Sequence, residues 1–360
     1  MSRVILMAGT QKGAFLFYSD EAREVWHIEG PLHKGWNVFD VQMDQRLEPA
    51  LYAALGHYVY GATIQYSHDF GHEWTMAESN PTYAEGDPSK MKDIWCVVPG
   101  PPSQPETLYA GVAEAGIFVS HDRGKNWAEL PGLSHHGTRE EWMPGFGGLC
   151  CHTILWDKDN PKRLWAAISA VGVFRSDDGG STWKEKNDGL EIIIEGQKHK
   201  CVGSCVHSMV QDPADPNRLF QQNHRGVYAS TDGGDSWGRI ENGLPSTFGF
   251  PIALSPRQPD TLFIALQESD EFRMAIDGKL AIHRSTDAGK SWQALRKGLP
   301  DKTWAGVMRQ ALTTDSLDET GVYFGTSSGQ IYYSRNNGDS WQAIPCTLPR
   351  INSLRVAVVG

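Results

Sequence analysis

The sequence of 360 residues carries 33 Lys and Arg against 43 Asp and Glu, which gives a formal charge of −10 at pH 7. This acidic balance argues against nucleic acid or an anionic membrane as the main partner, because both require a basic face. No stretch approaches the roughly 20 apolar residues of a membrane span, and the apolar run in MSRVILMAGTQKG is too short for a signal peptide. We therefore expect a cytoplasmic protein whose six cysteines are reduced thiols.

An eight-residue frame, Ser-x-Asp-x-Gly-x-x-Trp, recurs along the chain. Five copies are complete, namely SHDFGHEW (67–74), SHDRGKNW (120–127), SDDGGSTW (176–183), STDGGDSW (230–237) and STDAGKSW (285–292). A sixth, SRNNGDSW (334–341), has Asn336 in place of the Asp, and Ser19-Asp20 followed by Trp26 is an eroded seventh. Successive serines lie 48 to 56 residues apart, a period typical of one four-stranded sheet per repeat.

Each frame follows a β-rich run that begins near a glycine, from GAFLFYS early in the chain to GQIYYS late in it. A second strand such as TLYAGVA and a third such as HTILWDKD lie upstream, and the residues after the Trp supply a short outer strand. The frame is thus predicted to form the hairpin before the outermost strand. Its Ser and Asp bond to the turn backbone, its Gly takes a positive φ, and its Trp is buried while the indole N–H finds a partner.

This pattern resembles the Asp-box (BNR) repeat of β-propellers, found in sialidase-like, sortilin-like and photosystem-assembly-factor proteins. The resemblance covers essentially the whole chain and implies an all-β fold, a single seven-bladed propeller domain of residues 1–360. The first blade begins directly with RVILMAGT, and the chain ends with an unused strand, INSLRVAVVG (351–360). We expect that strand to pair beside residues 3–10 and close the ring, which removes exposed sheet edges.

The segments on the face opposite the frames are long and uneven, at 79–93, 131–151, 189–206, 267–278 and 300–308. Sites in propellers usually collect on that face around the axial channel, so we expect a ligand-binding funnel there. Trp36, Trp142 and Trp304 lie on such segments, where flat rings stack on sugars or pack in the core.

Four residues on this face make a sufficient donor set for Zn²⁺, Mn²⁺ or Fe²⁺. His152 and His207 precede inner strands at equivalent places, in CCHTILWD and CVHSMVQD, while His224 and Glu114 lie in neighbouring turns. Metal-free substrate binding, acid–base catalysis and a purely structural role are the alternatives for the histidines. If the site is catalytic, Glu114, His152 and His207 are the expected catalytic residues.

Five further residues are expected to bind substrate: Lys12, His57, Arg225, Arg273 and Arg309. Guanidinium groups hold carboxylate or phosphate bidentately, so the three arginines indicate an anionic ligand. The alternative is that they pair with nearby acids such as Glu268, Asp270 and Glu271.

We expect an enzyme, a hydrolase or lyase that acts on a small anionic or sugar-like substrate, with assistance from a divalent metal left open. A sialidase fits less well, because that resemblance requires an Arg-Ile-Pro segment and this chain has Arg3-Val4-Ile5 without a following Pro. The alternative class is a non-catalytic ligand-binding or assembly scaffold, like the photosystem-assembly-factor propellers. The sequence does not indicate the oligomeric state.

Overall fold

The computed structural model describes residues 3–193 and 201–360, so part of the expected loop 189–206 lies outside the described residues. Three short helical pieces occur in these ranges, namely α1 (Pro131–Ser134) and the 3-10 turns η1 (Arg139–Glu141) and η2 (Ile276–Gly278), and all other described regular elements are strands. The predicted all-β class is confirmed. Over the same ranges, no helix has the length and apolar character that crossing a bilayer requires.

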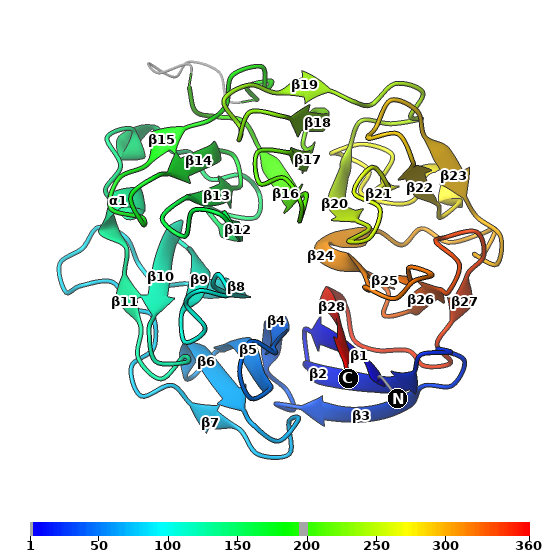
Figure 1. Cartoon of the computed structure of the whole chain (residues 1–360), viewed down its shortest axis with the longest axis horizontal. Helices are drawn as coiled ribbons and strands as arrows, with labels where there is room; N and C mark the ends of the chain where they lie inside the picture. The colour runs from blue at the N-terminus through cyan, green and yellow to red at the C-terminus, as the bar shows by residue number, and fades with distance from the viewer. Residues whose placement is uncertain (1–2, 194–200) are drawn as a thin grey trace. The chain divides into compact units, whose positions relative to one another are not determined.

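The chain divides into two compact units, of which the central unit comprises residues 36–206 and 231–237. It contains three four-stranded antiparallel sheets, each built from consecutive strands (Figure 1). Their strands are β4 (Asn37–Asp44), β5 (Ala50–His57), β6 (Gly61–Ser67) and β7 (Thr75–Met76); β8 (Asp93–Pro99), β9 (Leu108–Ala113), β10 (Gly116–Ser120) and β11 (Ala128–Glu129); and β12 (Cys151–Trp156), β13 (Leu164–Ile168), β14 (Gly172–Ser176) and β15 (Lys184–Glu185).

The terminal unit comprises residues 1–35, 207–230 and 238–360. Two of its sheets have four consecutive strands, β16 (Val206–Gln211), β17 (Leu219–Asn223), β18 (Gly226–Ser230) and β19 (Gly238–Arg239), then β20 (Gly249–Leu254), β21 (Leu262–Leu266), β22 (Ile282–Ser285) and β23 (Gln293–Leu295). The third sheet has eight strands, in the order β27 (Gln342–Ala343), β26 (Ile331–Ser334), β25 (Val322–Thr326), β24 (Val307–Thr314), β28 (Ile351–Val359), β1 (Arg3–Thr10), β2 (Gly13–Asp20) and β3 (His27–Leu32).

Strand β28 joins the two ends of the chain in one sheet. It pairs antiparallel with β1, from Arg3 opposite Val359 to Thr10 opposite Ile351, and the two termini lie close together in Figure 1. The predicted pairing of residues 351–360 with residues 3–10 is therefore confirmed. A single parallel pair between β28 and β24 merges two four-stranded groups into the eight-stranded sheet. The seven-blade count and the closure of a ring stay predictions.

The second strand is apolar along its whole length in three of the sheets, as β9, β13 and β21. Every residue of β9 and of β13 is buried, so both faces of these strands are covered. Side chains from the two strands share one core in the central unit, which includes Tyr109, Ile168 and the frame residue Trp183. Strands covered on both faces read as continuous apolar runs rather than as alternating patterns.

The recurring frames form the predicted hairpins, each between the third and the outermost strand of its sheet. In the third copy, the Ser176 hydroxyl donates to Asp178 Oδ1 at 2.8 Å and accepts from the Gly180 N–H at 2.8 Å. Asp178 Oδ1 also accepts from the N–H of Thr182 at 2.9 Å. In the sixth copy, the amide oxygen of Asn336 accepts the same kinds of hydrogen bonds, which explains why this substitution keeps the turn.

The frame glycine is required for two reasons. All six have φ between 86° and 95°, the left-handed region that glycine enters without a steric cost. Several also contact a side chain of an earlier sheet, and a Cβ on Gly180 would lie 2.8 Å from Leu130 while one on Gly289 would lie 2.5 Å from Ile240. The residue before the glycine also has a positive φ, which the sequence did not reveal: Phe70, Arg123, Ala288 and Asn337 lie between 55° and 61°.

The frame tryptophans use their indole N–H groups in two ways. Trp183 donates to the Gly180 carbonyl within its own turn at 3.1 Å, while Trp292 donates to the Ile240 carbonyl at 2.7 Å. The indole of Trp341 has no hydrogen-bond partner among the described residues, so the predicted bond is absent in that copy. In the eroded copy, the Trp26 ring packs edge-on against Tyr323 and Tyr333 instead.

We predict that Asp287→Ala lowers the midpoint of thermal unfolding at pH 7 by about 2–4 °C, and that Asp287→Asn lowers it less. The Asp287 carboxylate accepts from the Ser291 N–H and hydroxyl and from the Ser285 hydroxyl, and an Asn retains an acceptor, as Asn336 shows. The Ser291 hydrogen bonds lower the pKa of Asp287 from 3.8 to about 2. Its stabilisation is therefore complete above about pH 4 and disappears as the pH falls toward 2.

The measurement is a set of thermal unfolding curves between pH 2 and pH 7. Asp287→Asn should show a shallower loss of stability below pH 4 than the unmodified chain, and the reciprocal control Asn336→Asp should show a steeper one. Identical melting of all four proteins at every pH would contradict this account of the turn.

Candidate functional site

Two carboxyl groups lie at one end of the β8–β9 pair in the central unit. Asp93 begins β8 and pairs with Ala113 at the end of β9, so Glu114, the next residue, starts the adjoining turn. Lys92 Nζ lies 2.7 Å from Glu114 Oε1, and Arg139 Nη2 lies 3.9 Å from Oε2. Two cations therefore face the Glu114 carboxylate.

The other carboxyl group, that of Asp93, lies in a different environment. Burial raises the pKa of Asp93, and the neighbouring Lys92 charge offsets only part of that rise. A Cβ on Gly56, the second-to-last residue of β5, would lie 3.6 Å from Asp93 Oδ1 and 3.1 Å from the Phe39 ring. The carboxyl group is thus covered from the β5 side, which favours its neutral form.

The residues that follow Gly56 take part in an aromatic stack. We define this aromatic stack as Trp36, His57, Tyr58 and Tyr60. The Trp36 ring is 4.6 Å from His57 and 5.7 Å from Tyr60, and the planes of Trp36 and Tyr60 differ by only 9°. The Tyr58 side chain is 95% exposed and that of Tyr60 is 67% exposed. The predicted substrate-binding residue His57 therefore belongs to an exposed platform of flat rings.

The other two tryptophans considered for sugar stacking differ from Trp36. Trp142 is buried and packs against Phe174, so it is a core residue. Trp304 is 63% exposed and packs against Gly278 without a second ring.

In the terminal unit, His207 and His224 come together. His207 is the second residue of β16, and its Nδ1 is 2.6 Å from the Gly249 carbonyl. His224 lies in the β17–β18 turn, and its Nε2 is 3.0 Å from Asp270 Oδ2. The two imidazole centroids are 5.4 Å apart.

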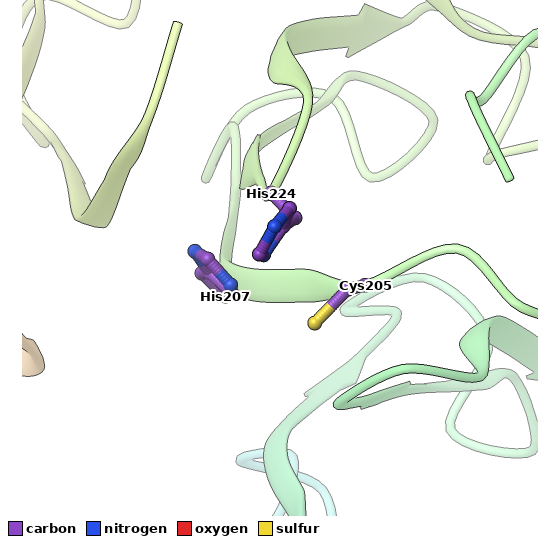
Figure 2. A group of neighbouring side chains, drawn as sticks. All are labelled: Cys205, His207 and His224. Atoms are coloured by element: carbon purple, nitrogen blue, oxygen red, sulfur yellow. The ribbon is translucent and has the colours of Figure 1, made fainter. Parts of the chain in front are cut away.

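A thiol completes this group. Cys205 directly precedes β16, and one ligand atom each from Cys205, His207 and His224 lie within 4.8 Å of one another (Figure 2). In the sequence, Cys201 and Cys205 lie close to His207, and soft-metal ligation or a redox-sensitive rim is the alternative to incidental thiols there. Since Cys205 and His207 are separated by one residue, the local backbone sets their spacing.

The predicted metal residues His152 and Glu114 lie in the central unit, where each has partners of its own. His152 Nε2 is 2.9 Å from the Val206 carbonyl, and its Nδ1 is 3.0 Å from Thr153 Oγ1. The two histidines are equivalent, as predicted, because each bonds to the carbonyl of the first residue of an inner strand, β16 for His152 and β20 for His207. This equivalence favours the structural alternative for His152, and the four-residue metal site stays a prediction.

Two of the three arginines, Arg273 and Arg309, lie over a phenylalanine pair, Phe248 and Phe250, in the terminal unit. The guanidinium carbon of Arg273 is 5.6 Å from the Phe250 ring centre, and that of Arg309 is 5.2 Å from the same ring. Arg225 Nη2 is 4.0 Å from Asp270 Oδ2, so the alternative of pairing with a nearby acid is realised there. Lys12 lies in the β1–β2 turn with an exposed side chain, and anion binding by any of these residues stays a prediction.

Electrostatics keep His224 neutral near pH 7. Burial lowers the pKa of His224, and the Arg225 and Arg273 charges lower it further, while the hydrogen bond and charge of Asp270 raise it by less. The Phe248 ring lies 5.2 Å from His224 and 5.4 Å from His207, which contributes to that burial.

Comparison with known proteins bears on the repeats first. The family model described as BNR-Asp box repeat matches residues 117–130, which contain the second complete frame. The chain therefore contains Asp-box repeats. The family model described as "Sortilin, neurotensin receptor 3" matches residues 171–306 of this Asp-box protein.

The relatives are much longer than this Asp-box chain. The oligoxyloglucan-reducing end-specific xyloglucanase of Emericella nidulans is 24% identical over 214 residues, which cover 55% of this chain and 24% of that protein. The chain thus spans about a quarter of the length of this relative.

Solved structures with low identity have a similar fold. An ancestral GH74 enzyme matches with a TM-score of 0.61 at 20% identity, covering 85% of this chain and 38% of its own. YCF48 bound to D1 peptide matches with a TM-score of 0.55 at 13% identity, covering 87% of this chain and 84% of its own.

We predict that Gly116→Ala destabilises the protein by about 1–3 kcal/mol, the usual cost of overpacking. The Tyr83 hydroxyl donates to the Glu114 carbonyl, and a Cβ on Gly116 would lie 2.3 Å from that hydroxyl oxygen. Tyr83→Phe removes the hydroxyl, so Gly116→Ala should cost less in the Tyr83→Phe background. Chemical unfolding of the two single variants and the double variant measures this coupling, with Gly137→Ala, which meets no atom within 4 Å, as the control. If the two substitutions change the free energy of unfolding additively, the predicted coupling is contradicted.

Proposed function

We propose that the chain binds a carbohydrate on the aromatic stack of the central unit and hydrolyses its glycosidic bonds with Asp93 and Glu114. The observation that carries this proposal is the contrast between the two carboxyl groups. Burial raises the pKa of Asp93, whereas Lys92 and Arg139 face Glu114. Glycoside hydrolases need such a pair, one carboxyl group neutral and the other ionised.

The catalytic roles of the two carboxyl groups follow from these environments. Asp93 is the general acid, which gives its proton to the oxygen of the leaving sugar as the glycosidic bond breaks. Glu114 is the carboxylate that either activates the attacking water or attacks the anomeric carbon itself. The Tyr83 hydroxyl and the Lys90 carbonyl bond to the Glu114 backbone and orient the turn that carries it.

The substrate class follows from the aromatic stack of the same unit. Trp36 and Tyr60 are nearly parallel, and sugar rings stack on flat aromatic faces. The similar proteins are named xyloglucanases, so we propose a polysaccharide of the xyloglucan kind in place of the small anionic substrate expected from the sequence. This mechanism uses no metal.

One observation favours the alternative class, a non-catalytic binding protein. Tyr58, Val59 and Tyr60 are all exposed at the tip of the β5–β6 hairpin, a surface that also suits a peptide. YCF48 bound to D1 peptide is similar in fold. Saccharide or peptide binding without any turnover would favour this class.

We predict that Asp93→Asn and Glu114→Gln each lower kcat on xyloglucan oligosaccharides by about 10²–10⁴-fold, the usual contribution of a general acid or base. The readout is the release of new reducing ends. The exposed acid Glu85 lies on the loop before Asp93, and Glu85→Gln is the matched control with unchanged turnover. In the unmodified enzyme, activity should fall as the pH rises past the raised pKa of Asp93. Full turnover by both folded variants would refute the assignment.

We predict that Trp36→Ala weakens oligosaccharide binding about tenfold, because an aromatic contact contributes about 0.5–1.5 kcal/mol beyond the area it buries. Trp36→Phe keeps a ring and should lose less. Calorimetric titration measures both constants. Phe146→Ala removes another fully exposed ring of the same unit and should bind like the unmodified chain. Equal affinity in all four proteins would exclude the aromatic stack as the binding surface.

A further inference from the structure

The proposed hydrolysis leaves the histidine group of the terminal unit without a role. We infer that Cys205, His207 and His224 form a binding site for a divalent transition metal of the zinc type. This site is independent of the carboxyl pair described above, and its donors are one thiol and two imidazoles.

The spacing of the donors suits a metal ion. Zinc binds sulfur at about 2.3 Å and imidazole nitrogen at about 2.0–2.1 Å, so tetrahedral ligands lie about 3.4–3.7 Å apart. The three ligand atoms here lie within 4.8 Å of one another, and Figure 2 shows the three side chains as neighbours. Pairs of ligand atoms therefore need to approach by no more than about 1.4 Å to reach coordination distance.

Both histidines have the hydrogen bonds that metal-binding histidines typically make. A ligating imidazole usually donates its second N–H to a carboxylate or a backbone carbonyl, which fixes the tautomer. His224 donates from Nε2 to Asp270, and His207 donates from Nδ1 to the Gly249 carbonyl. In each neutral ring the lone pair is therefore on the other nitrogen, Nδ1 of His224 and Nε2 of His207.

The residues around the three donors, and the donors themselves, favour a metal ion of the zinc type. Phe250 stacks on His207 at 4.5 Å, and Phe248 packs edge-on against both imidazoles, so one side of the group is apolar. The charges of the Cys205 thiolate and of Asp270 match that of a divalent ion, and the thiol proton is released on binding. Thiolate with imidazole suits zinc rather than Mg²⁺ or Ca²⁺. Three protein ligands leave a fourth position for water or a ligand.

The experiment uses the full chain, stripped with a chelator under reducing conditions and titrated with Co²⁺ and then Zn²⁺. One Co²⁺ per chain should give intense tetrahedral visible bands and a thiolate charge-transfer band, and Zn²⁺ should displace it. Cys205→Ser should abolish the charge-transfer band, whereas Cys346→Ser, which changes a half-buried cysteine outside the group, should leave it unchanged.

Two further readouts address variants that fold poorly. Asp270→Asn alters no ligand and should weaken Co²⁺ binding about 10–100-fold, the usual effect of losing a carboxylate that supports a ligating histidine. Zn²⁺ should raise the unfolding temperature of the unmodified chain but not that of His224→Gln. The absence of Co²⁺ binding to the unmodified chain, or a charge-transfer band that survives Cys205→Ser, overturns the inference.

Discussion

The hydrogen bonds of one serine hydroxyl fix the geometry on which each repeat depends. In five of the frames, this hydroxyl links an Asp or Asn side chain to the N–H of a glycine with a left-handed backbone. The same glycine then lies against a side chain of an earlier sheet, as Gly180 does at Leu130. A larger residue would break the turn and the packing together. Because this end of each sheet is fixed, the opposite end can vary in length and composition without a loss of register.

The two candidate sites use that variable end for unlike chemistry. The central unit brings together hard oxygen donors and flat exposed rings, a combination suited to proton transfer and sugar stacking. The start of β16 and the β17–β18 turn bring together sulfur and nitrogen donors next to a phenylalanine pair, a combination suited to a soft metal ion. Both sites use the same parts of their sheets, namely a turn between the second and third strands and the start of an inner strand. One scaffold therefore carries two sets of functional groups, which is why the fold alone says little about activity.

The sequence predicted the repeated features well and the unrepeated ones poorly. The frame hairpins, the strand order and the pairing of β28 with β1 followed from spacing, because each copy repeats the same local rules. His207 and His224 were predicted together because both occupy regular positions of one sheet. Asp93 was not predicted as an acid, since its raised pKa comes from burial in the folded chain, where it lies near Gly56, a residue distant in the sequence. Cys205 and the parallel rings of Trp36 and Tyr60 carry no spacing that a single sequence reveals.

The sheet shared by β1 and β28 also constrains how the protein is made. Strand β1 is apolar and buried almost throughout, yet one of its two edges is completed only by residues 351–359. At about 5–20 residues per second, synthesis of the intervening chain takes roughly 20–70 s. During that time β1 has an unsatisfied edge, a state prone to aggregation. Translation speed and chaperone supply therefore become determinants of yield, separate from the stability of the finished fold.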